Sequence, residues 1–127
     1  MINKNILVTG GAGFIGSNYI DFLIREKKGL FIVNLDKLTY ASNVDFIKKF
    51  ESNKNYQFIQ GDINDKKLLI KIFKHYKIDG VINFAAESHV DNSISSPEIF
   101  IKSNILGVYS LLEVCMKFWM KKPFLPN

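Results

Sequence analysis

Residues 8–17, VTGGAGFIGS, decide the fold, because three glycines recur there at every third position directly behind an apolar run. A strand, a glycine-rich loop and a helix in this order are typical of a dinucleotide-binding turn. Gly10 would permit the tight turn, Gly13 would let a pyrophosphate approach the backbone, and Gly16 would let the helix pack close to the strand. The phosphates would face the free amide groups at the positive end of the helix dipole. The simpler alternative is a strand-to-helix turn that happens to be built of small residues.

Outward from this loop, four short apolar runs alternate with longer segments of helical periodicity. We expect strands at residues 5–10, 30–36, 56–62 and 80–86, and helices at about 13–28, 44–51, 66–76 and 98–120, with Asp65 capping the third helix and Pro97 opening the fourth. This alternation predicts an α/β fold, a Rossmann-like doubly wound parallel sheet of about four strands in the order 3-2-1-4. The whole chain, 1–127, would be one domain, and its tail, 121–127, would add no strand.

The composition fits one globular domain, with 47% hydrophobic and 23% charged residues in 127. No apolar run approaches the roughly 20 residues of a membrane span, and no signal peptide is recognisable, so we expect a cytoplasmic protein without a membrane partner. The net charge of +5 comes mostly from scattered lysines, which indicates a solvated surface rather than nucleic-acid binding. The single cysteine, Cys115, is expected to be buried in a helix, and no residue cluster suggests a metal site.

An aspartate ends the second predicted strand, 20 residues after the last loop glycine, at Asp36. A carboxylate in this place can accept hydrogen bonds from both hydroxyls of an adenosine ribose, and it would repel a 2′-phosphate. The sequence therefore favours NAD over NADP, although the adjacent Lys37 slightly weakens that exclusion. The alternative is an aspartate that only caps a turn.

The third and fourth predicted strands also end in candidate ligand-binding residues. Asp62 could accept a hydrogen bond from an adenine amine while Ile63 packs on the ring, or it could belong to a plain turn. Ala85 and Ala86 are small enough to leave room for a cofactor. The polar residues Glu87, Ser88, His89 and Asp91 follow, and taken alone they are a polar loop with no sign of a hydrolytic triad.

Five segments together resemble the dTDP-glucose 4,6-dehydratases, which are extended short-chain dehydrogenases/reductases. They are VTGGAGFIGSN (8–18), NLDKLTYASN (34–43), GDI (61–63), FAAESHVDNSI (84–94) and FIKSNILGVYSLLE (100–113). The resemblance implies a lyase of nucleotide-sugar metabolism that uses tightly held NAD and converts dTDP-glucose to a 4-keto-6-deoxy sugar nucleotide, a precursor of rhamnose and other surface sugars. It also implies a homodimer, in which the long last helix takes part.

The residue arguments and the resemblance together define a predicted cofactor site. Its members are Gly10, Gly13, Phe14, Ile15, Gly16, Asp36, Lys37, Leu38, Thr39, Asp62, Ile63, Phe84, Ala85, Ala86, Glu87, Ser88 and Ser103. By resemblance, Phe14 and Ile15 lie against the pyrophosphate and Asp36 to Thr39 hold the adenosine ribose. Phe84 to Ser88 line the nicotinamide side, and Ser88 also lies near the substrate.

The family's catalytic segments do not occur in this sequence. The resemblance places a Thr-Asp-Glu segment and a Tyr-x-x-x-Lys pair after the fourth helix, followed by a substrate domain, so we assign no catalytic residue and expect this chain alone to be inactive. The alternatives are a non-catalytic NAD-binding module and an inactive truncated remnant. The fourth strand would then expose an apolar edge with Val81, Ile82 and Phe84.

Overall fold

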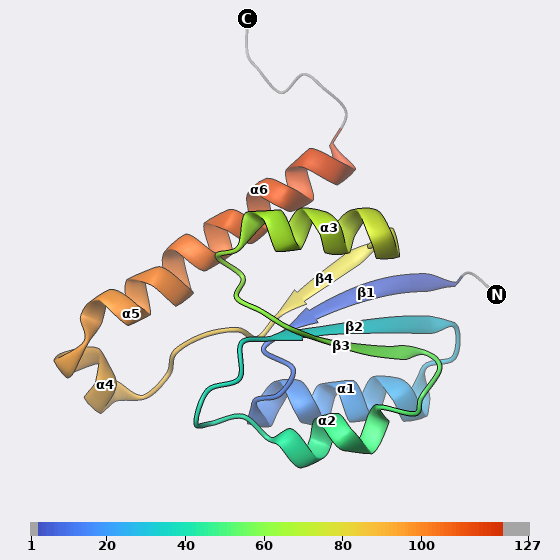
Figure 1. The fold of residues 1–127 in the computed structure, drawn as a ribbon, viewed down its shortest axis with the longest axis horizontal. Coiled ribbons are helices and arrows are strands. Elements are labelled where there is room, and N and C mark those ends of the chain that lie inside the picture. The colour runs from blue at the N-terminus through green and yellow to red at the C-terminus, as the bar shows by residue number, and fades with distance from the viewer. Residues whose placement is uncertain (1–2, 121–127) are drawn as a thin grey trace, which may run out of the picture.

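A four-stranded parallel sheet forms the centre of the computed structural model, which describes residues 3–120 (Figure 1). Its strands are β1 (Lys4–Thr9), β2 (Leu30–Asp36), β3 (Tyr56–Gln60) and β4 (Gly80–Asn83), and their order is β3-β2-β1-β4. In the register, Val8 of β1 lies opposite Asn34 of β2 and Ile82 of β4. The predicted fold class and strand order are confirmed, and the tail at 121–127 lies outside the described residues.

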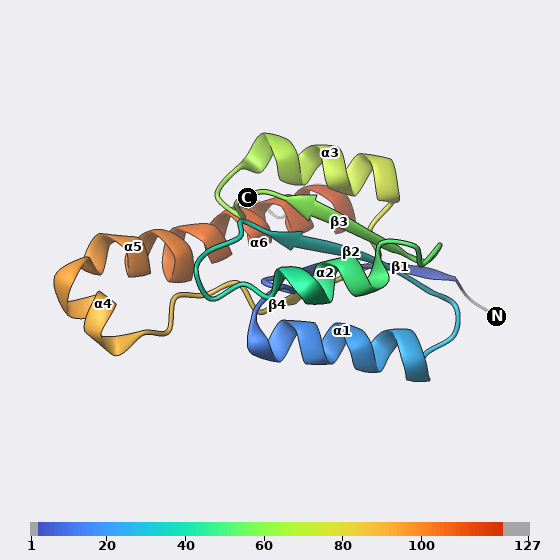
Figure 2. The same cartoon turned by 60° about the horizontal axis from the view of Figure 1, so that its bottom comes forward.

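Helices cover both faces of the sheet (Figures 1 and 2). Helices α1 (Phe14–Glu26) and α2 (Val44–Phe50) lie on one face, and α3 (Lys66–Tyr76) and α6 (Gly107–Trp119) lie on the other. Successive strand residues point to opposite faces, so the continuous apolar runs of β1 and β2 supply two cores. Leu7 and Val33 pack toward α3 and α6, whereas Val8 and Ile32 pack toward α1 and α2.

Local signals explain where the helices begin. The Asp65 side chain accepts a hydrogen bond from the Leu68 amide at 3.0 Å, so the predicted cap of α3 is confirmed. Pro97 is the first residue of α5 (Pro97–Ile101), as predicted.

Two strands are shorter than predicted, because each stops where its partner stops. β3 ends at Gln60 rather than at residue 62, opposite the last residue of β2, Asp36. β4 ends at Asn83 rather than at residue 86, since its partner β1 ends at Thr9 and the chain turns away at Gly10. The Phe84 amide donates to the Thr9 carbonyl at 2.9 Å, and this is the last bond of that ladder. The residues that follow, 84–89, consequently form a loop instead of extending the strand.

The segment after β4 differs from its prediction in two ways. A short helix, α4 (Val90–Ser95), lies where a polar loop is expected; it buries none of its residues, so no apolar period marked it. The predicted single helix 98–120 is interrupted by a π-helical turn, η1 (Lys102–Leu106), between α5 and α6. In that turn the Gly107 amide donates to the Lys102 carbonyl, five residues back.

Much of the surface of this composite helix, Pro97–Trp119, is apolar and exposed. Ile101, Ile105, Leu112 and Met116 are more than half exposed, and only 28% of the most apolar window is buried. By length and composition the helix could cross a membrane, since its most apolar window has a mean hydropathy of 1.5. This segment was not recognised from the sequence, because charged residues interrupt its apolar runs. A single such helix is weak evidence for a membrane, because core helices of soluble proteins have the same character. Cys115 lies on this helix and is half-buried rather than buried.

Candidate functional site

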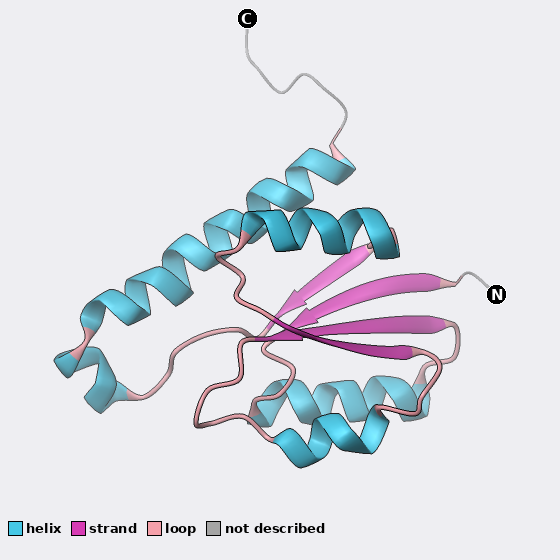
Figure 3. Ribbon diagram, viewed as in Figure 1, coloured by secondary structure: helices cyan, strands magenta, loops and turns pink. Residues whose placement is uncertain are grey.

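A cavity of about 500 Å³ lies at the carboxyl ends of the strands, which all point to one side of the molecule (Figure 3). Its volume lies within the range of small-molecule sites, and its place is the one where doubly wound sheets bind ligands. It is lined by Gly10, Gly13, Phe14, Ile15, Gly16, Leu35, Asp36, Lys37, Thr39, Ala41, Ser42, Gly61, Asp62, Ile63, Phe84, Ala85, Ala86, Glu87, Ser88, His89 and Ser103.

The structure gathers every residue of the predicted cofactor site around this cavity except Leu38. Leu38 lies beside it with a left-handed backbone, at φ 61°, and donates its amide to Asp36. Sequence reasoning missed four further lining residues, Leu35, Ala41, Ser42 and Gly61, which lie at or just after the ends of β2 and β3. What these residues bind stays a prediction.

The three regularly spaced glycines of the loop differ in how much room each has for a side chain. Gly10 has φ +68°, and a Cβ there would lie 2.5 Å from the Ala85 amide nitrogen. A Cβ on Gly16 would lie 2.3 Å from the Gly10 carbonyl oxygen, so α1 packs against the loop with no room for a methyl group. A Cβ on Gly13 would meet only that same oxygen, at an ordinary 3.4 Å, and otherwise open space. The loop therefore leaves a methyl-sized volume free at Gly13, where the cavity is.

The amino end of α1 has no side-chain cap. Gly13 is its N-cap residue and the first turn holds no acidic residue. Amide groups at a helix start need acceptors, and a bound anion supplies them as well as a side chain does. Because Gly13, Phe14, Ile15 and Gly16 all line the cavity, this helix end fits a phosphate group.

The Asp36 carboxylate is nearly buried, at 9% exposure, and lies beside the glycine loop. One oxygen accepts from the Ala12 amide at 2.9 Å. The other accepts from the Leu38 amide at 2.8 Å and from the Ser42 hydroxyl at 3.5 Å. Asp36 thus caps its turn and also lines the cavity, so the two interpretations of this residue are compatible.

Asp62 belongs to a turn, with one carboxylate oxygen accepting from the Asn64 amide at 2.9 Å and from its side-chain nitrogen at 3.1 Å. The Asn64 side chain also donates to the Lys102 carbonyl of η1 at 3.1 Å, which ties the loop after β3 to the π-helical turn. Ile63 is buried, and its side chain packs so close to Gly107 that a Cβ there would lie 2.5 Å from it. Asp62 and Ile63 still line the cavity.

The π-helical turn contributes Ser103 to the cavity wall and Asn104 to the contact with the loop after β4. Ser103 is buried and Asn104 is exposed. The Asn104 side chain accepts from the Glu87 amide at 2.9 Å and donates to the Glu87 carbonyl at 3.0 Å. The Lys37 ammonium lies 3.2 Å from the Glu87 carboxylate and donates to the Ser103 hydroxyl at 3.4 Å. The ends of β2 and β4 are therefore joined across the site, a link that no local pattern in the sequence predicts.

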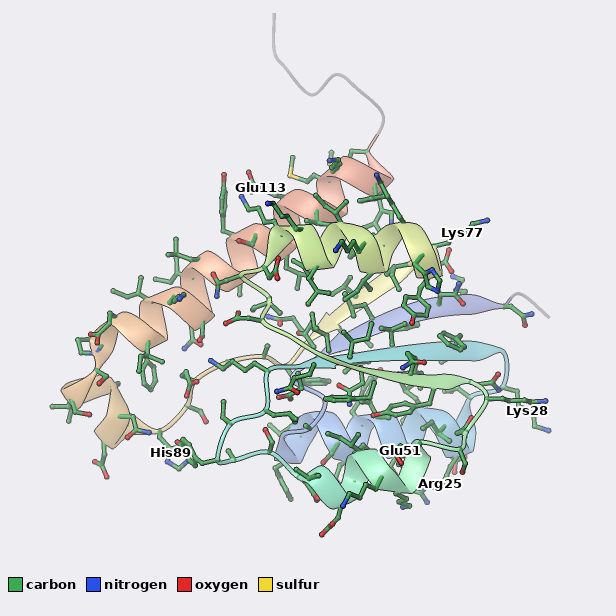
Figure 4. All side chains as sticks on the ribbon, viewed as in Figure 1. Arg25, Lys28, Glu51, Lys77, His89 and Glu113 are labelled. Atoms are coloured by element: carbon green, nitrogen blue, oxygen red, sulfur yellow. The ribbon has the colours of Figure 1, made fainter. Side chains whose placement is uncertain are left out.

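His89 lies among the loops that follow the strands, at the opposite end of the molecule from Lys28 and Lys77 (Figure 4). It is exposed and lies beside the Tyr40 ring, with centroids 5.4 Å apart. Among residues 3–120, no group of three or more metal-ligating side chains comes together.

Comparison with known proteins gives one consistent result. The GDP-mannose 4,6 dehydratase family model matches residues 7–125. A dTDP-glucose 4,6-dehydratase from Haemophilus influenzae is 48% identical over 115 residues, which cover 91% of this chain and 34% of the relative. Among solved structures, a dTDP-glucose 4,6-dehydratase from Bacillus anthracis in complex with NAD superimposes with a TM-score of 0.80 and 36% identity, covering 91% of this chain and 34% of that one.

The fold is shared more widely. A UDP-glucose 4-epimerase from Thermotoga maritima gives a TM-score of 0.78 and 36% identity, covering 92% of this chain and 35% of the epimerase. This chain therefore spans about a third of the length of the proteins it resembles.

Proposed function

This chain belongs to the GDP-mannose 4,6 dehydratase family, and on that premise we propose that it forms the NAD-binding part of a dTDP-glucose 4,6-dehydratase. One observation carries the proposal: the uncapped start of α1, the open space at Gly13 and the buried Asp36 carboxylate all adjoin the same cavity. These are the groups that a dinucleotide needs for its pyrophosphate and its adenosine ribose.

Each wall of the cavity has its own part in the proposal. The glycine loop and the first turn of α1 bind the pyrophosphate through backbone amides. Asp36, Lys37, Leu38 and Thr39 hold the adenosine ribose, and the Ala12 and Leu38 amides keep the Asp36 carboxylate in place for it. The loop from Phe84 to Ser88 lines the nicotinamide side.

Asp62 and Ile63 bind the adenine at the end of β3. Ser103, buried in η1, completes the cofactor site from the helix side, and Ser88 lies beside the sugar substrate. When bound, NAD supplies an acceptor for a hydride that it later returns to the same sugar. This chain's own residues bind and orient the cofactor, and we assign proton transfer to none of them.

The proposed substrate of the complete enzyme is dTDP-glucose. The enzyme would act in nucleotide-sugar metabolism in the cytoplasm and would form a homodimer. Similar TM-scores for a dehydratase and an epimerase mean that the fold alone does not choose between these reactions. The choice of a dehydratase is supported by the 48% identity to the Haemophilus influenzae enzyme.

The test is a thermal-unfolding titration of the purified chain with NAD. Binding to the folded state alone adds RT ln(1 + [L]/Kd) to the stability, about 2.7 kcal/mol at a hundredfold excess over Kd. For a domain of this size that corresponds to a rise of roughly 10 °C in Tm. An unchanged midpoint at millimolar NAD would overturn the proposal.

A matched pair of variants makes the titration specific. Asp36 and Asp65 each accept a hydrogen bond from a backbone amide, but only Asp36 lines the cavity. Asp36→Ala and Asp65→Ala should both lower the Tm without ligand. Only Asp36→Ala should weaken the response to NAD.

A further inference from the structure

Four side chains that line the described part of the cavity carry a formal charge. Asp36, Asp62 and Glu87 are negative, and Lys37 is the one positive group among them. A dinucleotide brings further negative charge into this site. The place that Lys37 takes therefore bears directly on which dinucleotide the cavity accepts.

Lys37 directly follows Asp36 in the chain, yet its ammonium group does not stay at the end of β2. It lies 3.2 Å from the Glu87 carboxylate and 3.4 Å from the Ser103 hydroxyl, so it reaches over to the loop after β4 and to η1. The Lys37 side chain is 38% exposed and that of Glu87 is 14% exposed. The ion pair is thus partly shielded from water on the carboxylate side.

The Asn104 side chain holds the backbone of Glu87 in place. Both its amide and its carbonyl are hydrogen-bonded to the side chain of Asn104, at 2.9 Å and 3.0 Å. The Glu87 backbone therefore cannot shift toward β2 without breaking bonds to the π-helical turn, and its side chain starts from a fixed point at the end of β4. The ion pair with this anchored residue places the Lys37 charge over the loop after β4.

This inference rests on the proposed function, which places the adenosine ribose beside Asp36. A 2′-phosphate on that ribose would add nearly two negative charges next to a buried carboxylate, and Lys37 is the lining residue that could neutralise them. We propose that Glu87 is a specificity-determining residue, which excludes NADP by keeping the Lys37 ammonium at the end of β4.

The experiment measures Kd for NAD and for NADP, by calorimetry at low salt, with four forms of the chain. They are the wild type, Glu87→Gln, Lys37→Gln and the double variant. Glutamine keeps the shape of Glu87 and loses only its charge. In Glu87→Gln the released lysine should improve NADP affinity relative to NAD by about 3- to 5-fold, the upper part of the range measured for exposed charge pairs. Raising the salt concentration should shrink this gain.

The double variant separates the proposed mechanism from a general loss of negative charge. If the gain comes through Lys37, Glu87→Gln in the Lys37→Gln background should leave the NADP-to-NAD ratio within twofold of that of Lys37→Gln alone. The same gain in both backgrounds would overturn the inference, as would an unchanged ratio in Glu87→Gln. A wild type that binds neither nucleotide would refute the proposed function and this inference together, whereas normal NAD binding with an unchanged ratio refutes the inference alone.

Discussion

Replacing Gly13 with alanine should separate cofactor binding from folding. The backbone at Gly13 has φ −76° and ψ 175°, an extended conformation that alanine adopts without strain. The new methyl group would meet only the Gly10 carbonyl oxygen, at 3.4 Å, and would otherwise project into open space beside the cavity. It would therefore stand where the pyrophosphate is proposed to approach the backbone.

The expected magnitudes follow from these contacts. Alanine is a poorer N-cap residue than glycine but restricts the unfolded chain, so the two effects should leave the free energy of unfolding within about 1 kcal/mol of the wild type. Gly16→Ala is the matched control, because its methyl group would lie 2.3 Å from the Gly10 carbonyl oxygen and 2.8 Å from the Gly11 Cα. Both are backbone atoms, so this variant should lose about 1–3 kcal/mol or more.

The assay combines thermal unfolding by circular dichroism with calorimetric titration of NAD. Gly13→Ala should keep its Tm within about 5 °C of the wild type and lose at least about tenfold in NAD affinity. Gly16→Ala should lose stability even without ligand. A Gly13→Ala protein that folds normally and binds NAD as tightly as the wild type would refute the assignment of this loop to the pyrophosphate.

Three further predictions concern groups away from the loop. A hydrogen bond from Lys49 holds the pKa of the Asp21 carboxyl below its usual value. Asp21→Asn should therefore lose up to about 1 kcal/mol at pH 7, and in urea unfolding the difference from wild type should shrink steadily as the pH falls below about 4. Burial raises the pKa of the Cys115 thiol, so iodoacetamide at neutral pH should alkylate the folded chain at least about tenfold more slowly than the urea-unfolded chain. Tyr56→Phe removes the 2.9 Å partner of the fully buried Asn34 side chain, and urea unfolding should show a loss of about 1–3 kcal/mol.

Local signals in the sequence were enough for most of the fold. The continuous apolar runs of β1 and β2, the Asp65 cap and Pro97 each depend on a few neighbouring residues, and each prediction agrees with the structure. The strand order followed because parallel strands with helical crossovers allow few topologies. The strand ends were less accurate, since β4 stops where its partner β1 turns away at Gly10.

The sequence by itself also determined most of the residues that gather at the candidate site, because the ends of parallel strands meet at one edge whatever the details of packing. Only the tertiary structure decided how those residues interact. Two contacts join segments far apart in the chain: the hydrogen bonds of Asn104 to the Glu87 backbone and the ion pair of Lys37 with Glu87. The π-helical turn that carries Asn104 was likewise not predicted. Side-chain distances of this kind depend on how β2, β4 and the last helix pack together, and no periodicity or spacing along the chain encodes them.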